Sequence, residues 1–481
     1  MNLAKERKEW FGNLRGDVLA GLVSSFAVIP EVVGFCIVAG ISPMMGLYAS
    51  FWLTVLMAFL GGRPAMISAA AGSMALVIVS LVRDYGPEYL MAATILCGVI
   101  MFVLGVLGIG NLIKLIPNTV QIGFVDALAI LIFSSQLANF EGEGWQMFAL
   151  VALGIAIIYF FPYVTTAMPS TLVAVVVVTA IAIIGHVDVR TIGDMGNITA
   201  TLPPFHIPEV PLNMETFMIV LPYSASLAIV GLSETLLTSK VIDEMTDSKG
   251  DRNRECRSLG IANIVSGFFS GTCGCAMIGQ AIVNVNSGGR GRFSNFVSGS
   301  FLMVLIFLLN DLMVQIPLAA LTAVMITVSI STFDWGALKR LPHMPKSDAL
   351  VVVLVIAVVV ATNNLAYGVV LGLALTAIFF ALHMANLSVR EDRDGKTIVY
   401  NVRGQLFFAS TEAFTQALDF HNNARTVILD FTNARIWDES AATAIRGAIM
   451  HFENNGNQVQ IADIDRKSCD LLQHLYGEVE F

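Results

Sequence analysis

The chain has 481 residues, of which 56% are hydrophobic and only 13% are charged, and its mean hydropathy is +0.74. This composition excludes a soluble globular protein. The net charge of -9 arises mainly from loops and from the C-terminal tail, so it says little about partners and gives no sign of nucleic-acid binding. No catalytic triad, metal-site cysteine spacing or cofactor loop is evident, and we therefore expect a protein that is not an enzyme.

Apolar runs long enough to cross a bilayer, around 20 residues each, recur from about Leu14 to Leu387. They number about fourteen, and several are short or interrupted by Gly and Pro. Met1 to Asp17 is polar and the apolar sequence that follows continues into more apolar sequence, so no cleavable signal peptide is expected. The pattern predicts a polytopic α-helical membrane protein.

The first apolar run extends from Gly16 to Gly40 and is broken by Pro30 and Glu31. A carboxylate at membrane depth costs free energy unless it faces a cavity or a partner. Glu31 is therefore a cavity candidate, and the alternative is a carboxylate at a helix end in the headgroup region.

A different kind of segment follows Pro64, where a short extended piece leads into Ala, Gly and Ser before the apolar residues Leu76 to Val82. We interpret it as a half-helix that begins in the middle of the membrane. Gln121 is a polar residue within a later apolar run. It either lines the same cavity or makes a hydrogen bond between helices.

The segment from Ser270 to Gln280 is the counterpart of this half-helix, because Gly, Ser and Cys again stand between two apolar stretches. The start of such a half-helix leaves about four N–H groups unpaired, and these favour an anion. The alternative is a tight crossing of two complete helices at small residues. Two interrupted segments predict a binding site between inverted repeats, which we place at residues 14–184 and 213–387.

Glu234 and Thr238 lie four residues apart in the apolar run from Met214 to Val241 and share one helix face. A carboxylate and a hydroxyl on one face can hold Na⁺ together with backbone carbonyls, since hard cations take oxygen ligands. The same carboxylate can instead bind a proton. The structural alternative is an ion pair between Glu234 and Lys240.

Cation-rich loops, among them Lys249 to Arg257 and Gly288 to Arg292, fall on one side of the membrane if the N-terminus is cytoplasmic and the runs alternate. We therefore expect a multi-pass protein of the inner (plasma) membrane with both termini in the cytoplasm. After Leu387 the sequence changes to a soluble α/β pattern over residues 388–481. Strands are expected at Thr397–Val402, Gly404–Phe408, Val427–Phe431 and Val459–Ala462, and helices at Glu412–His421 and Ser440–Asn454.

The chain resembles the SulP family of anion transporters over essentially its whole length. The resemblance rests on Gly16 to Leu22, Ile29-Pro30-Glu31, Arg63-Pro64, Leu236 to Ser239 and Val283 to Arg290, and residues 388–481 resemble the STAS domain. It implies fourteen spans in a 7+7 inverted repeat like that of the uracil permease, a transmembrane domain at residues 1–387, and a homodimer.

By this resemblance the substrate site lies between the third and tenth spans. Its residues are Ala70, Ala71, Gly72, Ser73, Cys275, Ala276, Met277 and Ile278. The coupling cation would bind at Glu234, Thr238 and Gly274, and Gln280 joins Glu31 and Gln121 as a cavity candidate.

Three departures from the family pattern qualify the function that the resemblance implies. Glu234 stands where sodium-coupled members carry Asp, so Na⁺ and H⁺ both remain open. Gln280 stands where many members carry Arg, which favours a monovalent anion such as bicarbonate, with sulfate still open. Glu439 occupies the phosphorylatable Ser position of anti-sigma-factor antagonists, which leaves the STAS domain a role in folding and in positioning a dimer.

The sequence therefore predicts a secondary active transporter that imports a small inorganic anion together with Na⁺ or H⁺. No other cofactor is expected. The alternatives are a C4-dicarboxylate symporter of the same family and an anion-gated membrane sensor without net transport.

Overall fold

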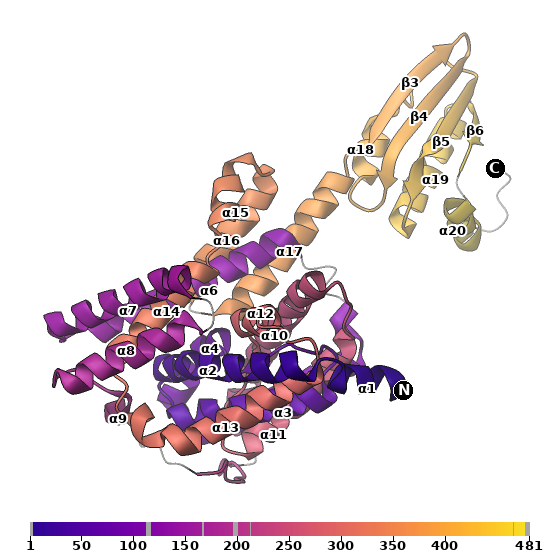
Figure 1. The fold of residues 1–481 in the computed structure, drawn as a ribbon. Helices are drawn as coiled ribbons and strands as arrows, with labels where there is room; N and C mark the ends of the chain where they lie inside the picture. Colours follow the sequence, from indigo (N-terminus) through magenta and orange to yellow (C-terminus); the bar gives the residue numbers. More distant parts are fainter. Residues whose placement is uncertain are drawn as a thin grey trace. The chain divides into compact units, whose positions relative to one another are not determined.

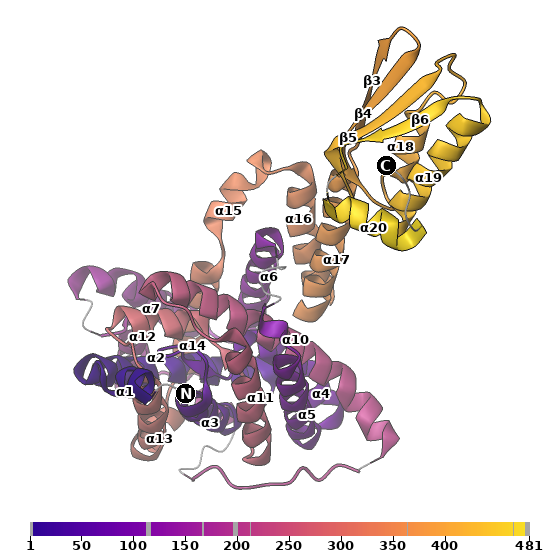
Figure 2. The same cartoon turned by 90° about the vertical axis from the view of Figure 1, so that its right-hand side faces the viewer.

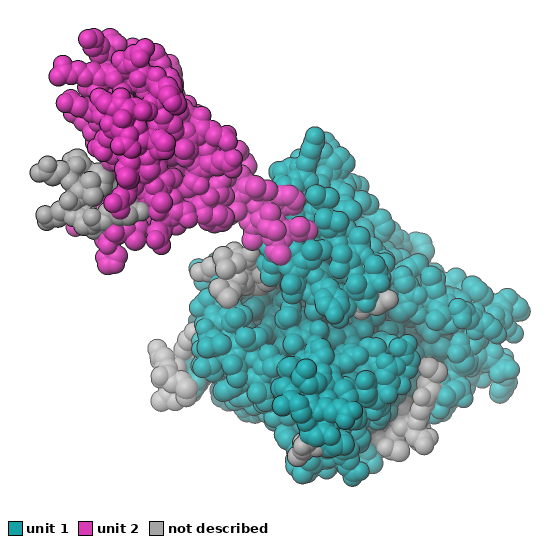
Figure 3. Space-filling view, turned by 180° about the vertical axis from the view of Figure 1, so that it is seen from behind, with its two compact units in different colours: residues 1–373 teal, residues 374–481 magenta. Residues whose placement is uncertain are grey.

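The computed structural model describes residues 3–111, 117–165, 168–195, 201–211, 213–362, 364–464 and 466–476. The chain divides into two compact units, Met1–Leu373 and Ala374–Phe481, which Figure 3 distinguishes by colour. The division falls inside helix α17 (Leu365–Met384). The placement of the boundary between the transmembrane and STAS domains at residue 387 stays a prediction.

The larger unit consists of two successive series of helices, shown in Figure 1. The first series is α2 (Leu14–Ala39), α3 (Pro43–Leu60), α4 (Gly72–Tyr85), α5 (Pro87–Val106), α6 (Asn118–Leu137), α7 (Trp145–Val164) and α8 (Ser170–Ile184). The second series is α10 (Met214–Thr246), α11 (Arg252–Phe268), α12 (Ile278–Asn286), α13 (Arg292–Val314), α14 (Leu318–Thr332), α16 (Lys346–Thr362) and α17. Shorter pieces are α1 (Leu3–Phe11), α9 (Ile192–Met195), α15 (Trp335–Arg340), η2 (Ala138–Phe140) and η3 (Leu341–His343).

Among the described residues, eight helices are long and apolar enough to cross a membrane, and two more are apolar but shorter. The helical membrane fold expected from the composition is thereby confirmed. One boundary was predicted wrongly, because residues 249–257 were expected to form a loop. Helix α11 already begins at Arg252, since the Asp251 side chain accepts a hydrogen bond of 3.0 Å from the Arg254 N–H and caps the helix.

The third helix of each series is preceded by a two-residue strand, β1 (Ser68–Ala69) before α4 and β2 (Cys275–Ala276) before α12. The two strands pair antiparallel, with Ser68 opposite Ala276 and Ala69 opposite Cys275. Equivalent strands that pair antiparallel have the relation expected of halves with inverted topology.

Helix packing separates the larger unit into two bundles. The first, here the core bundle, contains α2, α3, α4, α5, α10, α11, α12 and α13. The second, the flanking bundle, contains α6, α7, α8, α14, α16 and α17, with Gly372 of α17 lying against Val120 of α6 and Val355 of α16. Figures 1 and 2 both show α2, α3 and α13 running beside one another.

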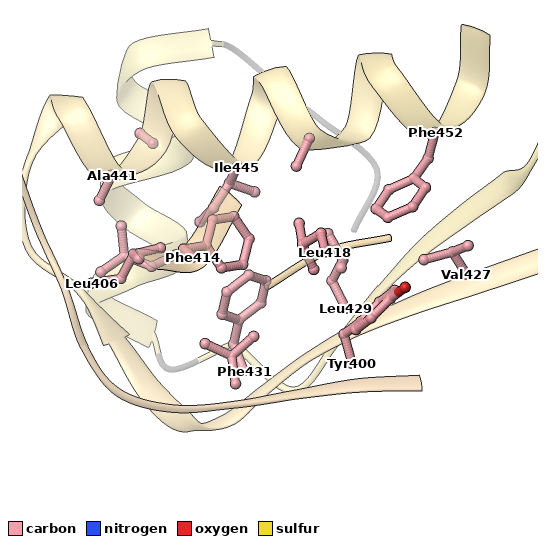
Figure 4. Packing of buried hydrophobic residues seen from close by; sticks show 14 of the residues in the cluster. Tyr400, Leu406, Phe414, Leu418, Val427, Leu429, Phe431, Ala441, Ile445 and Phe452 are labelled. Atoms are coloured by element: carbon pink, nitrogen blue, oxygen red, sulfur yellow. The ribbon is translucent and has the colours of Figure 1, made fainter. Parts of the chain in front are cut away.

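The smaller unit contains a four-stranded sheet in the order β3-β4-β5-β6. Strand β3 pairs antiparallel with β4, whereas β5 is parallel to both β4 and β6. Its elements are β3 (Ser388–Asp394), β4 (Thr397–Leu406), α18 (Thr411–Gln416), β5 (Thr426–Ile436), α19 (Glu439–Asn454), β6 (Gln458–Ala462) and α20 (Arg466–Tyr476). Its core is aromatic, with Tyr400, Phe414, Phe431 and Phe452 buried beneath α19 (Figure 4).

Several details of this unit were predicted wrongly from the sequence. Helix α20 was not expected, and the helix expected at Glu412–His421 is the shorter α18, which ends at Gln416. Strand β3 was not expected, because its residues are polar and mostly exposed and so lack the alternation of a half-buried strand. Residues 397–408 were expected to form two strands, but 397–406 form the single strand β4, whose register against β5 shifts between Asn401 and Arg403. Such an irregularity bends a strand without ending it.

Candidate functional site

The site is built on two half-helices whose first turns face the same space. Helix α4 begins at Gly72 after the extended residue Ala71, and α12 begins at Ile278 after the extended residue Met277. Neither N-cap side chain accepts a hydrogen bond from its helix. The Met74 N–H of α4 donates to the Ala71 carbonyl, but no N-cap side chain takes the other first-turn N–H groups, and both helix dipoles direct partial positive charge toward this space.

Side chains from neighbouring helices satisfy the backbone groups of the two strands. Thr54 donates to the Ser68 carbonyl at 2.6 Å, and Ser50 accepts from the Ala70 N–H at 3.2 Å. The Asn263 side-chain amide both donates to the Gly274 carbonyl and accepts from the Gly274 N–H, at 3.0 and 2.9 Å. Non-helical backbone at membrane depth is tolerated only when its polar groups are paired in this way.

The close approach of the strands depends on Gly274. A Cβ atom at this position would lie 2.3 Å from the Ala69 carbonyl oxygen and 2.4 Å from Leu53 Cδ1. Only a residue without a side chain fits here, so the small-residue composition of this stretch follows from backbone contact.

A cavity of about 150 Å³ lies between the core and flanking bundles, at the first turns of both half-helices. The core bundle contributes Glu31, Phe35, Ala71, Gly72, Ser73, Glu234, Met277, Ile278, Gly279 and Gln280. The flanking bundle contributes Phe124, Val125, Leu128, Ile132, Val328, Ser331 and Thr332. No Lys or Arg is among these lining residues, so the positive potential of the site comes from the helix termini.

Glu234 of α10 is the central carboxylate of this cavity, with a relative exposure of 7%. Its Oε2 atom accepts hydrogen bonds from the Ser73 hydroxyl of α4 and, at 3.2 Å, from the Cys275 thiol of β2. One carboxylate oxygen thus joins α10 to both half-helix segments.

The Thr238 hydroxyl stands one turn further along α10. It donates to the Glu234 carbonyl at 2.8 Å and lies 3.3 Å from the Ala276 carbonyl. Thr235, on the same helix, accepts from the Ala276 N–H at 3.1 Å. These two threonines fix β2 against α10 and thereby set the distance between Glu234 and α12.

Glu31 of α2 is the second carboxylate of the cavity, and its side chain interacts with that of Gln280. Gln280 is almost fully buried in the first turn of α12. An anion in the cavity therefore lies near two carboxyl groups and two helix N-termini, and its binding is favoured when the carboxyl groups are neutralised.

The structure brings together most of the residues that were expected to form the site. Ala71, Gly72, Ser73, Met277 and Ile278 line the cavity, as do Glu31, Glu234 and Gln280. Cys275 contacts the lining residues Glu234 and Ser73, while Ala276 and Gly274 hold the strand pair.

Two of the expected residues lie elsewhere. Ala70 lines a separate small cavity that also contains Cys36 and Cys273. Gln121 lies on α6 one turn before Phe124 and is not among the residues that line the larger of these two cavities, so the cavity alternative is not supported. The alternative of a hydrogen bond between helices stays a prediction.

The flanking-bundle wall was missed in the sequence. Phe124, Leu128 and Ile132 are apolar residues of an apolar helix, and nothing in their spacing distinguishes cavity from lipid. The adjacent hydroxyls of Ser331 and Thr332 at the end of α14 were the one available polar signal. Within the described parts of the chain, no group of three or more His, Cys, Asp or Glu side chains is placed to hold a metal ion.

Comparison with known proteins identifies matches over nearly the whole chain. The profile described as "Sulfate permease family" matches residues 14–149 and 143–355, and the profile described as "STAS domain" matches residues 388–475. The Bacillus subtilis protein named "Putative sulfate transporter YbaR" is 50% identical over 470 residues, which cover 98% of each chain.

Two solved structures are similar to this chain in fold. The transmembrane domain of a cyanobacterial bicarbonate transporter, BicA, is 28% identical, with a TM-score of 0.67 over 74% of this chain and 97% of its own. The murine anion transporter Slc26a9 has a TM-score of 0.83 over 98% of this chain and 89% of its own, and at 19% identity it shows the fold.

Proposed function

Since this chain belongs to the sulfate permease family of membrane anion transporters and carries a STAS domain, we propose that it imports a small monovalent anion, with bicarbonate favoured, together with a cation bound at Glu234. The observation that carries this proposal is the meeting of two half-helix N-termini and Glu234 in one cavity. The anion would be bound by the N–H groups and dipoles of α4 and α12.

The size and charge of the cavity support a small anion of low charge. Its volume of about 150 Å³ is below the roughly 300 Å³ at which sites for larger organic ligands begin. No lining Lys or Arg supplies a full positive charge that would offset the second charge of sulfate. Sulfate and C4-dicarboxylates are therefore the alternatives to be tested, with sulfate also suggested by the name of the Bacillus relative.

For the coupling ion we propose a proton. The Cys275 thiol lies against the same Glu234 oxygen as the Ser73 hydroxyl, whereas Na⁺ favours a shell of oxygen atoms. Because Oε2 already accepts two hydrogen bonds, Oε1 is the oxygen that would take the proton. A Na⁺ ion would instead be held by the carboxylate of Glu234 and the hydroxyl oxygens of Ser73 and Thr238.

The coupling follows from electrostatics. An anion beside an ionised Glu234 is repelled inside a medium of low dielectric constant, and an anion beside a neutralised Glu234 is held by the helix dipoles. Loading of both ligands is therefore favoured over loading of the anion alone, which is the condition for symport.

The deciding experiment is uptake of labelled bicarbonate, sulfate and fumarate into proteoliposomes under an inward proton or an inward sodium gradient. We expect bicarbonate to accumulate under the proton gradient. Because a proton gradient also shifts bicarbonate into carbon dioxide, protein-free liposomes must be measured at each pH and subtracted. Accumulation of sulfate or fumarate in place of bicarbonate would overturn the proposed substrate. Stimulation by the sodium gradient alone would overturn the proposed proton coupling.

Gln280 provides a test of anion selectivity. In the double variant Glu31→Gln/Gln280→Arg, a fixed positive charge enters the cavity without a neighbouring carboxylate to neutralise it. We expect sulfate uptake to rise relative to bicarbonate by about tenfold, since a divalent anion gains roughly twice the attraction.

The matched control for this experiment is Glu31→Gln/Gln280→Met, which keeps a long side chain but adds no charge. It should leave the sulfate-to-bicarbonate ratio near that of the unmodified protein. An equal change in both double variants would mean that volume, and not charge, sets the selectivity.

We further propose that both termini are cytoplasmic and that the chain acts as a homodimer. The cation-rich segments 249–257 and 288–292 lie on the N-terminal side of the membrane under this orientation, in agreement with the positive-inside distribution. Labelling of single cysteines introduced near each terminus in sealed vesicles, and chemical crosslinking of the full chain, measure these two properties.

A further inference from the structure

A second and larger cavity, of about 470 Å³, lies between the core and flanking bundles. Helix α2 separates it from the cavity that contains Glu234. Phe26, Ile29, Pro30 and Val33 face the larger cavity, whereas Glu31 lies on the opposite face of the same helix. Its other walls come from α8, α9, α14 and the end of α13.

The cavity is elongated along α8. Its lining residues on α8 include Leu172, Thr179 and Ile183, a spacing that follows one helix face. At about 1.5 Å per residue, the distance from Leu172 to Ile183 is roughly 17 Å. This exceeds the thickness of about 15 Å that one leaflet contributes to the hydrocarbon core, so one extended acyl chain fits along it.

The walls are apolar with one exception. Thr179 is the single polar residue that lines the cavity, and its Oγ1 atom is buried without a hydrogen-bond partner in the described structure. The surface that the cavity offers is therefore almost wholly hydrocarbon, which favours an apolar ligand.

The cavity also reaches the surface that faces the membrane. Val176 and Ile183 line it and are still 58% and 41% exposed, respectively. In a chain that spans the bilayer, the solvent at such an opening is lipid hydrocarbon.

From these observations we propose that this cavity binds one acyl chain of a membrane phospholipid. The chain lies between the two bundles and contacts α2 on the face opposite to Glu31. Occupancy therefore adds contacts between bundles that an empty cavity lacks.

Photocrosslinking of the full chain in proteoliposomes tests the proposal independently of transport. The probe is a phosphatidylethanolamine with a diazirine near the middle of one acyl chain, and adducts are mapped by peptide mass spectrometry. Ile29 and Val33 are 8% and 0% exposed, so a probe in bulk lipid does not reach them. We expect adducts at these two residues of α2.

Two variants on α8 make the test specific. Ala180→Phe places a ring in the cavity from an exposed lining residue and should reduce adducts at Ile29 and Val33 at least tenfold. Ile181→Phe is the matched control, because Ile181 is exposed on the same helix and does not line the cavity. It should leave the adducts unchanged.

Thr179→Val removes the one polar group of the lining but keeps the shape of the side chain. It should not lower the yield of adducts, because the hydroxyl is buried and the cavity holds hydrocarbon. A diazirine-bearing free fatty acid forms the second arm, and labelling by it alone would overturn the assignment to a phospholipid. Absence of adducts at Ile29 and Val33 with both probes, or equal labelling in Ala180→Phe, would show that no acyl chain enters.

Discussion

Replacement of Glu234 by Gln is expected to abolish the dependence of anion uptake on the cation gradient. The amide oxygen can still accept from Ser73 and Cys275, so the contact between α10 and the half-helices persists. The amide does not bind a proton in the physiological range, and it offers no full charge to Na⁺. The stimulation of uptake by the gradient should fall from a factor of roughly 5–150, the usual range of coupling between two ligands, to about one.

Asp126→Asn is the matched control for this prediction. Asp126 is a buried carboxylate of α6, but it accepts a hydrogen bond of 2.7 Å from the Asp334 N–H and does not line the cavity. An amide oxygen can accept the same bond, so coupled uptake should continue in this variant. Gradient-driven accumulation that survives in Glu234→Gln would show that another group couples the two fluxes.

Exchange of labelled anion across the membrane without a gradient separates a coupling defect from general damage. With Glu234→Gln the anion no longer meets the charge of this carboxylate, so exchange should persist while accumulation is lost. Loss of both activities in well-folded protein would mean that Glu234 is needed for anion binding itself.

The half-helices were predictable from the sequence because their composition violates the ordinary rule for a membrane span. Gly72, Ser73 and Gly274 stand where a lipid-facing helix would have large apolar residues, and Glu234 carries a charge at a depth that disfavours it. Local chemistry thus identified these three segments of the site. The sequence also predicted correctly that the two series of helices are inverted repeats, since the strands β1 and β2 pair as inverted halves would.

The contacts between these segments were not predictable. Ser73 and Glu234 are 161 residues apart, and their hydrogen bond is a product of the packing of α4 on α10. The flanking-bundle wall of the cavity is apolar, so its residues resemble any others in α6. A sequence pattern reveals residues that are unusual in a membrane span, such as Gly, Ser or Glu. Apolar residues that line a cavity cannot be distinguished in it from apolar residues that face lipid.

The same reasoning explains the missed strand of the smaller unit. Strand β3 is charged and mostly exposed along its length, and it lies at the edge of the sheet beside β4. Charged residues on an edge strand discourage pairing with a second molecule. Its backbone hydrogen bonds to β4, which leave no trace in the hydrophobic pattern, are what make it a strand.

The second large effect is expected from Gly274→Ala. The added methyl group would lie 2.3 Å from the Ala69 carbonyl oxygen, and a backbone atom in a strand pair cannot move away independently. The pair must separate, and the hydrogen bonds between Gly274 and Asn263 are strained with it. We expect a loss of about 1–3 kcal/mol or more in stability, a lowered melting temperature in detergent, and loss of anion uptake.

Gly279→Ala is the comparison that distinguishes steric conflict from a general intolerance of alanine in this region. No heavy atom lies within 4 Å of a Cβ atom built at Gly279, and the residue stands in the first turn of α12. Alanine in a helix is favoured over glycine by roughly 0.5–1 kcal/mol, so this variant should be at least as stable as the unmodified chain. Because Gly279 lines the cavity, its methyl group should instead weaken anion binding and raise the concentration needed for half-maximal uptake. Equal melting temperatures for the two variants would show that the strands do not approach as closely as the structure has them, and the geometry of the anion site would have to be drawn again.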